Sequence, residues 1–436
     1  MPESSTTHFL RDILRQPEEL QRTIERFAGP SGGGRGAIGA GRAQLDAAAE
    51  AIRDARHVYL TGIGSSWHAA LNVGAMLHQH GHPVYLQDAA ELLQFATFPK
   101  DSAVVILSRS GKSVEIVQLA AKARNSGAMV IGITNVADSP LAKEAQIPIV
   151  VPVALDHAIS VNTYTTIALA AGMVANSLVA EKEKADSSAS SYGGPQPEGR
   201  NDKSGVFQQG AKAPLMGQLS MSELKLRPPK DTASDLPTAS GQAPVRLPND
   251  SGLAESLSRA FAEAERAIPG WQEQIANSSW LAPHSTTYFL ARGTSLGSAY
   301  EARLMWEEGV KNPATAMGSA GFRHGPQEIV AENVRFGIWI DAVHMREQDL
   351  ALARDLRQLG ARVMLIGQNL PADAGDLVFQ LPAIAPEWQF LIDIIPAQLT
   401  AEHLSRLSGV DCDTFRLCSF IVKDDGGLLP KEAKNN

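Results

Sequence analysis

The stretch TGIGSSWHAA at residues 61–70 has a counterpart in LARGTSLGSA at residues 290–299. Each stretch begins at the end of a short apolar run, passes through glycine and adjacent hydroxyl side chains, and continues into a sequence with helical spacing. A strand that turns at glycine into a helix is the opening unit of an α/β domain. Because this unit occurs twice, the chain is predicted to contain an internal duplication of one α/β domain.

Short apolar runs alternate with longer amphipathic segments around each copy. In the first half these runs predict strands at 57–61, 84–86, 104–108, 129–134 and 147–153. In the second half they predict strands at 287–291, 334–340, 363–367 and 377–381. Strands that alternate with helices of 10–15 residues indicate βαβ units. The fold class expected is therefore α/β, with a parallel sheet flanked by helices in each half.

Composition divides the chain into five parts. Residues 1–45 contain an amphipathic stretch at 9–27 and are expected to form an N-terminal helical segment before a first domain at 46–182. Residues 183–250 are dense in Ser, Gly, Pro, Asp and Lys, and such a low-complexity segment buries too little apolar surface to offset the entropy lost on ordering. This segment is predicted to be a disordered linker. A second domain at 251–420 and a C-terminal tail at 421–436 follow it.

Composition and charge exclude several classes of protein. The formal net charge of −8 argues against a protein that binds nucleic acid by neutralising phosphates. No apolar run reaches 18 residues, and no apolar segment follows a basic N-terminus, so neither a membrane span nor a signal peptide is predicted. The two cysteines are too few for a disulfide framework and point to a reducing compartment. We expect a cytoplasmic protein with no nucleic-acid or membrane partner.

The segment LSRSGKS at 107–113 follows an apolar strand and precedes a helix that begins near Ser113. Ser108, Ser110 and Ser113 would place hydroxyl groups beside free backbone N–H groups at a helix N-terminus, where the helix dipole attracts anions. The alternative is that one serine simply caps the helix. A cap needs one hydroxyl, whereas three cluster here at a strand end, where open parallel sheets bind ligands. The segment is therefore predicted to bind a phosphate monoester.

Two other patterns are similar to cofactor or metal sites. The Gly62–Gly64 turn begins like a dinucleotide fingerprint, but Trp67 stands where a third glycine would let helix and strand pack closely. This turn is expected instead to contribute Ser65 and Ser66 to the phosphate site. Three histidines, His78, His80 and His82, are better explained as a solvated helix C-terminus than as metal ligands. No cofactor and no metal are predicted.

Taken in order, these segments resemble the sugar isomerase (SIS) domain family in its tandem-domain branch. The resemblance rests on GIGSSWHA at 62–69, LSRSGKS at 107–113, AISVNTYTT at 158–166, YEARLMWEE at 300–308, GFRHGP at 321–326 and PAQLTAEHLSRLSGVDCDTFR at 396–416. That branch includes the isomerase half of glucosamine-6-phosphate synthase and the tagatose-6-phosphate ketose/aldose isomerase type of amino-sugar-phosphate deaminase. The resemblance implies two tandem SIS domains, each a flavodoxin-like three-layer sandwich, of which the first binds a phosphosugar.

The resemblance also implies a substrate site and the groups that act on the substrate. The implied substrate-binding residues are Gly64, Ser65, Ser66, Ser108, Arg109, Ser110, Ser113, Ala158 and Ser160. Glu308 matches the base that moves a proton between C1 and C2. His324 matches the ring-opening histidine, which reaches the site from the neighbouring subunit of a homodimer. An aldose–ketose interconversion needs such a carboxylate and a second group for the ring oxygen. We expect one sugar site per subunit, in the first domain and completed by the second.

The chain departs from the family pattern at two lysines. The tail lysine that forms a Schiff base in the synthase is Phe420 here, and the nearest lysine is Lys423, a candidate for the same catalytic role. A second lysine, on the helix with the base, is Met305. Because residue 2 is proline and no nucleophilic cysteine follows the initiator, no glutaminase domain is expected in this chain.

The predicted function is that of a phosphosugar isomerase or amino-sugar-phosphate deaminase/isomerase. Such an enzyme would act on a hexose or hexosamine 6-phosphate by proton transfer through an enediol; synthesis from free ammonia also remains open. The alternative is a non-catalytic regulator that binds a sugar phosphate, which the two missing lysines favour. Retention of both Glu308 and His324 favours the enzyme, because a regulator needs neither residue.

Overall fold

The computed structural model describes residues 6–28, 37–191, 250–417 and 421–422. Both sheets belong to one compact unit, Met1–Glu183 with Pro248–Asn436, distinct from Lys184–Leu247. Helix α7 (Asn162–Ser191) ends inside the segment predicted as a linker, and helix α8 (Asp250–Ala276) begins at its last residue. The rest of that segment, 192–249, lies outside the described residues, as does most of the predicted C-terminal tail.

The first sheet has five strands in the order β2-β1-β3-β4-β5, and every neighbouring pair is parallel. Its strands are β1 (His57–Thr61), β2 (Tyr85–Leu86), β3 (Ser102–Ser108), β4 (Met129–Thr134) and β5 (Ile147–Val150). Strand β3 lies in the middle, and every one of its residues is buried. Such an unbroken buried run is typical of a parallel strand that is covered by helices on both faces.

The second sheet repeats this topology. Its strands are β6 (Thr286–Ala291), β7 (Ala314–Gly318), β8 (Val334–Trp339), β9 (Arg362–Gly367) and β10 (Leu377–Gln380), all parallel in the order β10-β9-β8-β6-β7. Read from the β7 edge, the second strand again precedes the first, third, fourth and fifth, which is the flavodoxin-like order. The predicted α/β class with two parallel sheets is confirmed. Strand β7 was not predicted, because its sequence ATAMG has a single β-branched residue, Thr315, and no aromatic residue.

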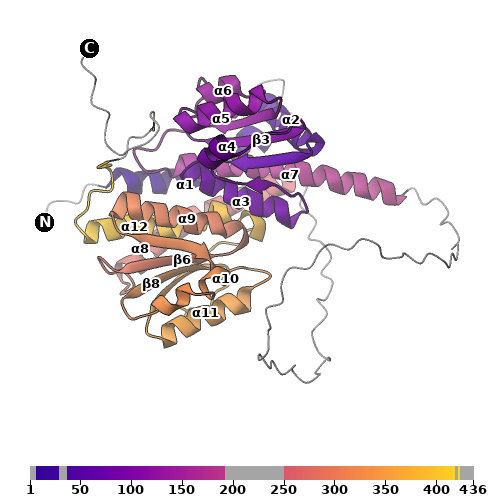
Figure 1. Cartoon of the computed structure of the whole chain (residues 1–436). Helices are drawn as coiled ribbons and strands as arrows, with labels where there is room; N and C mark the ends of the chain where they lie inside the picture. Colours follow the sequence, from indigo (N-terminus) through magenta and orange to yellow (C-terminus); the bar gives the residue numbers. More distant parts are fainter. Residues whose placement is uncertain (1–5, 29–36, 192–249, 418–420, 423–436) are drawn as a thin grey trace, which may run out of the picture. The chain divides into compact units, whose positions relative to one another are not determined.

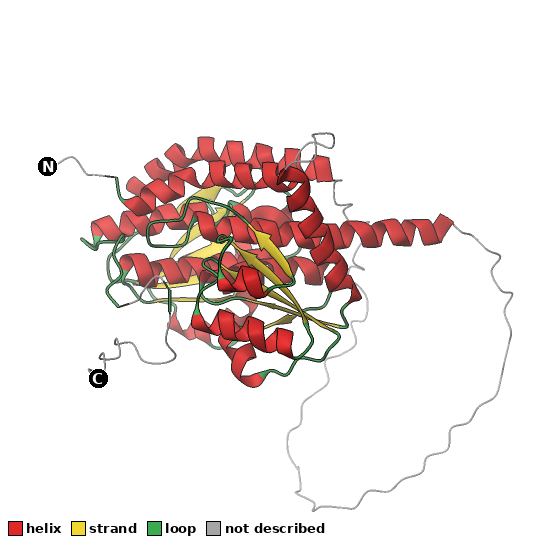
Figure 2. Cartoon of the chain, turned by 90° about the horizontal axis from the view of Figure 1, so that it is seen from above, coloured by secondary structure: helices red, strands yellow, loops and turns green. Residues whose placement is uncertain are grey.

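Helices cover both faces of each sheet (Figure 1), and in the view from above they overlie the strands (Figure 2). The first domain contributes α3 (Ser65–Gln79), α4 (Ala89–Phe95), α5 (Val114–Asn125), α6 (Pro140–Glu144) and α7. The second contributes α8, α9 (Leu296–Met305), α10 (Ser319–Phe322), α11 (Arg346–Gln358) and α12 (Ile395–Leu407), with short turns η1 (Gly293–Ser295), η2 (Trp306–Val310), η3 (Pro326–Ile329) and η4 (Pro386–Leu391). Helices α3 and α9 pack side by side between the two sheets (Figure 1), so they bring the two domains into direct contact.

The predicted N-terminal helical segment, 1–45, contains α1 (His8–Ala28) and the beginning of α2 (Ala37–Asp54), which continues past the predicted boundary. Helix α1 packs on α2, on α8 and on α12, and it buries Phe9, Ile13 and Leu20 in the largest apolar core. That core is continuous from the inner face of the first sheet to the inner face of the second, while each sheet has a separate smaller core on its outer face. The two domains therefore share a core.

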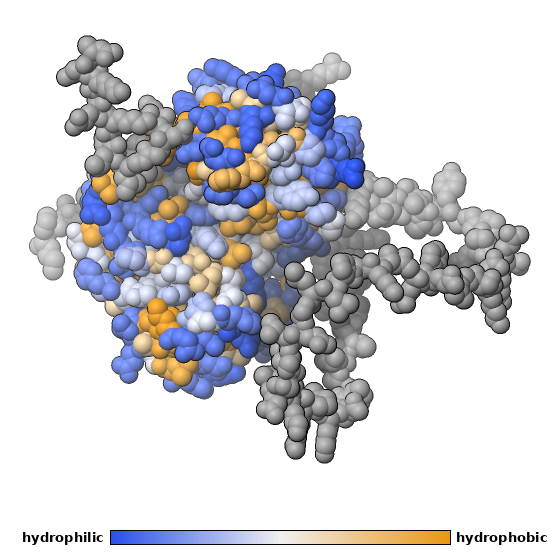
Figure 3. Space-filling view, viewed as in Figure 1, coloured by the Kyte–Doolittle hydropathy of each residue, from blue (hydrophilic) through white to orange (hydrophobic). Residues whose placement is uncertain are grey.

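The surface drawn in Figure 3 is mostly hydrophilic, with hydrophobic residues in small groups between hydrophilic ones. The most exposed large apolar side chain of the described residues is Phe95, on α4. Among the helices of the described part of the chain, none is long and apolar enough to cross a membrane.

Candidate active site

A cavity of about 180 Å³ lies at the carboxyl edge of the first sheet. The loops after β1 and β3, which leave the sheet at its topological switch point, form one side of it, and open α/β sheets bind ligands at this place. Its lining contains all nine residues implied as substrate-binding together with Glu308: Gly64, Ser65, Ser66, Ser108, Arg109, Ser110, Ser113, Ala158, Ser160 and Glu308. Ile63, Leu304 and Phe415 complete the lining.

Two helices begin at this cavity. Helix α3 begins at Ser65, directly after the Gly62–Gly64 turn. A Cβ atom on Gly62 would lie 2.5 Å from the backbone carbon of Ser66, so only glycine lets the strand end and the helix approach this closely. Helix α5 begins after Ser113. The two N-termini together create a region of positive potential that suits an anion.

Ser113 does not cap its helix with its side chain, which answers the alternative explanation for this serine. It occupies the N-cap position of α5, yet its hydroxyl makes no capping hydrogen bond. Elsewhere in the same domain, Ser139 accepts a hydrogen bond from the N–H of Ala142, and Asp88 accepts one from Ala90. The hydroxyl of Ser113 therefore remains available to a ligand in the cavity.

The loop between β3 and α5 is folded by its own serines. The Ser108 Oγ accepts a hydrogen bond from the N–H of Gly111 (3.1 Å), and the Ser110 Oγ accepts one from Lys112 (3.2 Å). Each hydroxyl keeps its hydrogen for donation to a ligand. Gly111 has φ of +61°, and a Cβ atom there would collide with the Ser139 hydroxyl, so the turn requires glycine.

Arg109 connects three loops around the cavity. Its backbone N–H donates to the Ser66 Oγ (3.3 Å), and its guanidinium donates to the carbonyl oxygens of Asp156 (2.9 Å) and Ala158 (3.2 Å). The side chain therefore orders the loop that supplies Ala158 and Ser160 to the lining.

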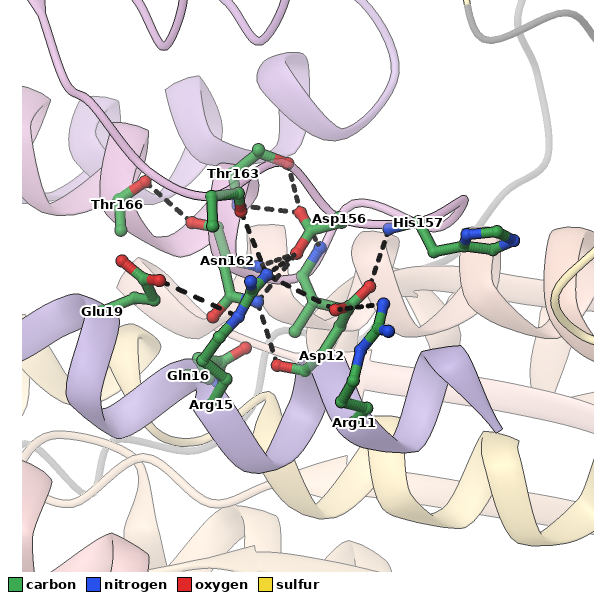
Figure 4. Close-up of polar contacts among 12 residues, drawn as sticks. Arg11, Asp12, Arg15, Gln16, Glu19, Asp156, His157, Asn162, Thr163 and Thr166 are labelled. Atoms are coloured by element: carbon green, nitrogen blue, oxygen red, sulfur yellow. Dashed lines mark hydrogen bonds and ion pairs between the residues drawn. The ribbon is translucent and has the colours of Figure 1, made fainter. Parts of the chain in front are cut away.

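A buried carboxylate within the same loop, that of Asp156, fixes the conformation of the loop (Figure 4). Asp156 accepts hydrogen bonds from the backbone N–H groups of Val161 (3.0 Å), Asn162 (3.1 Å) and Thr163 (3.0 Å) at the beginning of α7. Arg15 of α1 lies 3.5 Å from it. The N-terminal helix thus supports the cavity without lining it, and no motif in the sequence indicates this contact.

Glu308 enters the cavity from the second domain. It lies in η2, a π-helical turn that follows α9, and such turns are frequent at functional sites. Burial, and to a smaller extent the charge of Glu301, raise the pKa of Glu308 to about 7, while Lys311 and Arg109 act in the opposite direction. A carboxyl group with this pKa is half ionised near neutral pH and can both accept and return a proton.

Glu301, one heptad before Glu308, joins the two domains. It is fully buried, and its carboxylate lies 2.6 Å from the His68 Nδ1 and accepts a hydrogen bond from the Ser65 hydroxyl (2.9 Å). Both partners belong to α3 of the first domain. The sequence indicated the spacing of the two glutamates but not this interdomain pairing.

The other two residues predicted as catalytic are His324 and Lys423. His324 is exposed in the turn after α10 and does not line the cavity. Lys423 lies outside the described residues; the residue before it, Val422, accepts a hydrogen bond from the N–H of Val114 in the first turn of α5 (3.1 Å). Met305, at the position of the family's second lysine, is fully buried.

A larger hollow of about 740 Å³ lies at the amino edge of the second sheet and contains none of the predicted site residues. Four arginines line it, but three of them are already paired: Arg335 donates to backbone carbonyls, and Arg357 and Arg362 contact Asp376. Among the described residues we found no group of three or more His, Cys, Asp or Glu side chains that could hold a metal ion.

The chain is similar in sequence to several known proteins. The SIS domain family model matches residues 51–177. The isomerizing glutamine–fructose-6-phosphate aminotransferase of Symbiobacterium thermophilum is 24% identical over 414 residues, which cover 93% of this chain and 57% of that protein. The same enzyme of Pyrobaculum aerophilum is 29% identical over 142 residues, which cover 32% of this chain and 21% of that protein. The chain thus spans a fifth to just over half of the length of these relatives.

Solved structures share the fold over nearly the whole chain. The C-terminal domain of glucosamine-fructose-6-phosphate aminotransferase from Francisella tularensis aligns with a TM-score of 0.70 at 18% identity, over 95% of this chain and 99% of that one. The tagatose-6-phosphate ketose/aldose isomerase of Escherichia coli aligns with a TM-score of 0.65 at 16% identity, over 99% and 100%. Residues 51–177 thus match the SIS domain model, and the chain has the fold of these solved structures over nearly its whole length.

Proposed function

We propose that the chain isomerises a hexose or hexosamine 6-phosphate between its aldose and ketose forms, with deamination of the amino sugar as a variant of the same chemistry. One observation carries this proposal: Glu308 from the second domain lines the same cavity as the helix N-termini and hydroxyl groups of the first domain. The hydroxyl and backbone donors would bind the phosphate, and the carboxylate would face the sugar carbons. The names of the relatives support this substrate class.

In the open-chain aldose, the Glu308 carboxylate takes the proton from C2 while the C1 carbonyl oxygen gains a proton, which gives a 1,2-enediol. The carboxylic acid then returns its proton to C1 as the C2 hydroxyl loses its own, which gives the ketose. A pKa of about 7 suits both halves of this transfer.

The remaining catalytic groups follow from the same proposal. His324 is exposed on the second domain, so we propose that it opens the sugar ring in the cavity of the other subunit of a homodimer. Lys423 follows the residue whose carbonyl oxygen contacts the first turn of α5, and we propose that its amine assists at the sugar carbonyl.

The proposal is tested by NMR in deuterated water with fructose 6-phosphate and, separately, glucosamine 6-phosphate. We expect solvent deuterium at C1 or C2 with the wild-type protein and its loss in Glu308→Gln. Ammonia release from the amino sugar would add deamination. A protein that binds neither sugar would refute the proposed substrate class.

The second candidate function is a regulator that binds a sugar phosphate without turnover. The buried Met305, where the family has a lysine, favours it. In the same experiment a regulator would bind the sugar phosphate, which calorimetry detects, and would exchange no proton at C1 or C2.

A further inference from the structure

Lys311 ends the helical turn that carries Glu308, and it does so in a backbone conformation that lysine rarely adopts. Its φ is +59°, in the left-handed region that glycine and asparagine prefer. The N–H of Asn312 donates to the carbonyl oxygen of Trp306 (3.0 Å) and closes the helix end. Since asparagine would serve this turn with less strain, the lysine side chain itself is expected to have a task.

The ammonium group of Lys311 joins two segments that each contribute a residue to the lining of the cavity. It donates hydrogen bonds to the backbone carbonyl oxygen of Glu308 and to that of Thr414 (3.1 Å). It also lies 5.8 Å from the centre of the Phe415 ring, a cation–π distance. Phe415 and Glu308 both line the cavity, so this one side chain connects an apolar part of its wall to the turn of the base.

Nearby charges act on both Glu308 and Lys311. Glu308 is influenced by Glu301, Lys311, Arg109 and Glu307, of which the two cations stabilise its ionised form. Lys311 is influenced, in turn, by four groups: Arg416, Asp411, Cys412 and Glu308. Burial is the largest influence on Lys311 and lowers its pKa, followed by Arg416. The ammonium is therefore held in place against a desolvation cost, by its hydrogen bonds to the backbone carbonyl oxygens of Glu308 and Thr414.

We propose that Lys311 is a positioning residue of the active site, whose ammonium joins the Phe415 wall to the turn of Glu308 and places a positive charge at that turn. This inference rests on the proposed function, since Glu308 must be the base for the effect on catalysis to appear. It assigns Lys311 no contact with the substrate.

Two substitutions distinguish the role of the Lys311 ammonium group from the role of its left-handed backbone in ending the helical turn. Lys311→Asn suits the left-handed backbone but removes the ammonium, whereas Lys311→Arg keeps the positive charge and the donors. We expect Lys311→Asn to fold with unchanged or higher thermal stability, to raise KM several-fold, and to move the pH midpoint of proton exchange upward, because a cation beside the carboxylate is lost. Lys311→Arg should restore both values towards those of the wild type.

The titration of the Glu308 carboxyl, followed by carbon-13 NMR and assigned with Glu308→Gln, supplies a readout that does not require turnover. An upward shift of its midpoint in Lys311→Asn supports the inference even if no sugar is turned over, in which case only the proposed function fails. If Lys311→Asn changes neither the midpoint of the Glu308 titration nor KM, Lys311 only ends the helical turn, and the inference is overturned.

Discussion

The two domains share one topology but differ in what occupies the loops at the carboxyl edge of the sheet. In the first domain, the loop after β3 presents serine hydroxyls to the cavity, and the hydroxyl at the N-cap of α5 makes no capping bond. In the second, the corresponding loop after β8 is filled by Asp341. Its carboxylate accepts hydrogen bonds from the N–H groups of Val343 (3.2 Å), His344 (3.0 Å) and Met345 (2.8 Å), directly before α11.

The loops after the first strands differ in the same way. In the second domain Ser295 donates to Asp393 (2.7 Å), Thr294 donates to a backbone carbonyl, and Arg292 pairs with the buried Asp349 (2.7 Å). Carboxylates of the protein thus stand where an external anion would bind in the first domain. The comparison supports the proposal that, after duplication, the first domain binds the anion and the second provides the base.

The largest effect is expected from removing the hydroxyls of the first domain. Replacing Ser108 and Ser110 together by alanine should weaken the binding of fructose 6-phosphate by about two to four orders of magnitude, since each hydrogen bond to a charged group contributes about 1.5–3 kcal/mol. Calorimetric titration measures this. Thr294→Ala, in the equivalent loop of the second domain, should leave the affinity unchanged. Equal losses of affinity in both variants would contradict the proposal that the anion binds in the first domain.

The second test concerns the buried aspartate that precedes the last helix of each domain. Asp156 accepts hydrogen bonds from several backbone N–H groups, so Asp156→Ala should destabilise the protein by about 3 kcal/mol and also weaken sugar binding, since the loop of Ala158 and Ser160 loses its support. Urea unfolding gives the stability. The exposed Asp138, replaced by alanine, is the control and should change stability by less than about 0.5 kcal/mol. A loss no larger than that of the control would show that this network is dispensable.

Asp393, its counterpart in the second domain, should make stability depend on pH. Burial raises the pKa of Asp393 to about 7. Between pH 4 and 7 the folded protein then holds a proton that the unfolded chain has released, so stability falls as pH rises, by up to about 1.4 kcal/mol per pH unit. Asp393→Asn cannot ionise and should lose less stability than the wild type between pH 5 and pH 8. Identical losses in urea unfolding would show that Asp393 does not titrate in this range.

The smallest effect is expected at Asp341. Replacement by serine removes a carboxylate from the N–H groups before α11 and should cost about 1 kcal/mol of stability, as the loss of an N-terminal cap does. The stability difference from the wild type should narrow in sulfate, because the freed N–H groups can then bind an anion. If sulfate does not change this stability difference, the loop of the second domain does not bind an anion even when the Asp341 carboxylate is removed.

Local patterns in the sequence predict much of this structure. Strand β3 contains an unbroken apolar run at 103–107, and Ser108, Ser110 and Ser113 lie close together in the sequence that follows it, so both the strand and the clustering of these serines could be predicted. Strand β7 could not be predicted, because its mostly small residues form a strand only through pairing with β6.

Long-range contacts in the site have no local signal. Asp156 reaches α1, and Phe415 joins the cavity from near the C-terminus of the described chain. The π-helical turn of Glu308 depends on how α9 ends against α12 and the Lys311 turn. These features arise from packing between segments that are distant in sequence, and spacing alone does not reveal them.

The central claim is that one carboxylate of the second domain acts on a sugar bound in the first. The most direct measurement is the pH dependence of deuterium exchange at C1 and C2 of fructose 6-phosphate for the wild type, Glu308→Gln and Glu307→Gln. Glu307 lies on the same turn but is exposed and paired with Arg303 (2.7 Å). We expect the wild type and Glu307→Gln to exchange with a midpoint near pH 7 and Glu308→Gln to be slower by a factor of about 100 to 10,000. Exchange at the wild-type rate in Glu308→Gln would contradict the claim.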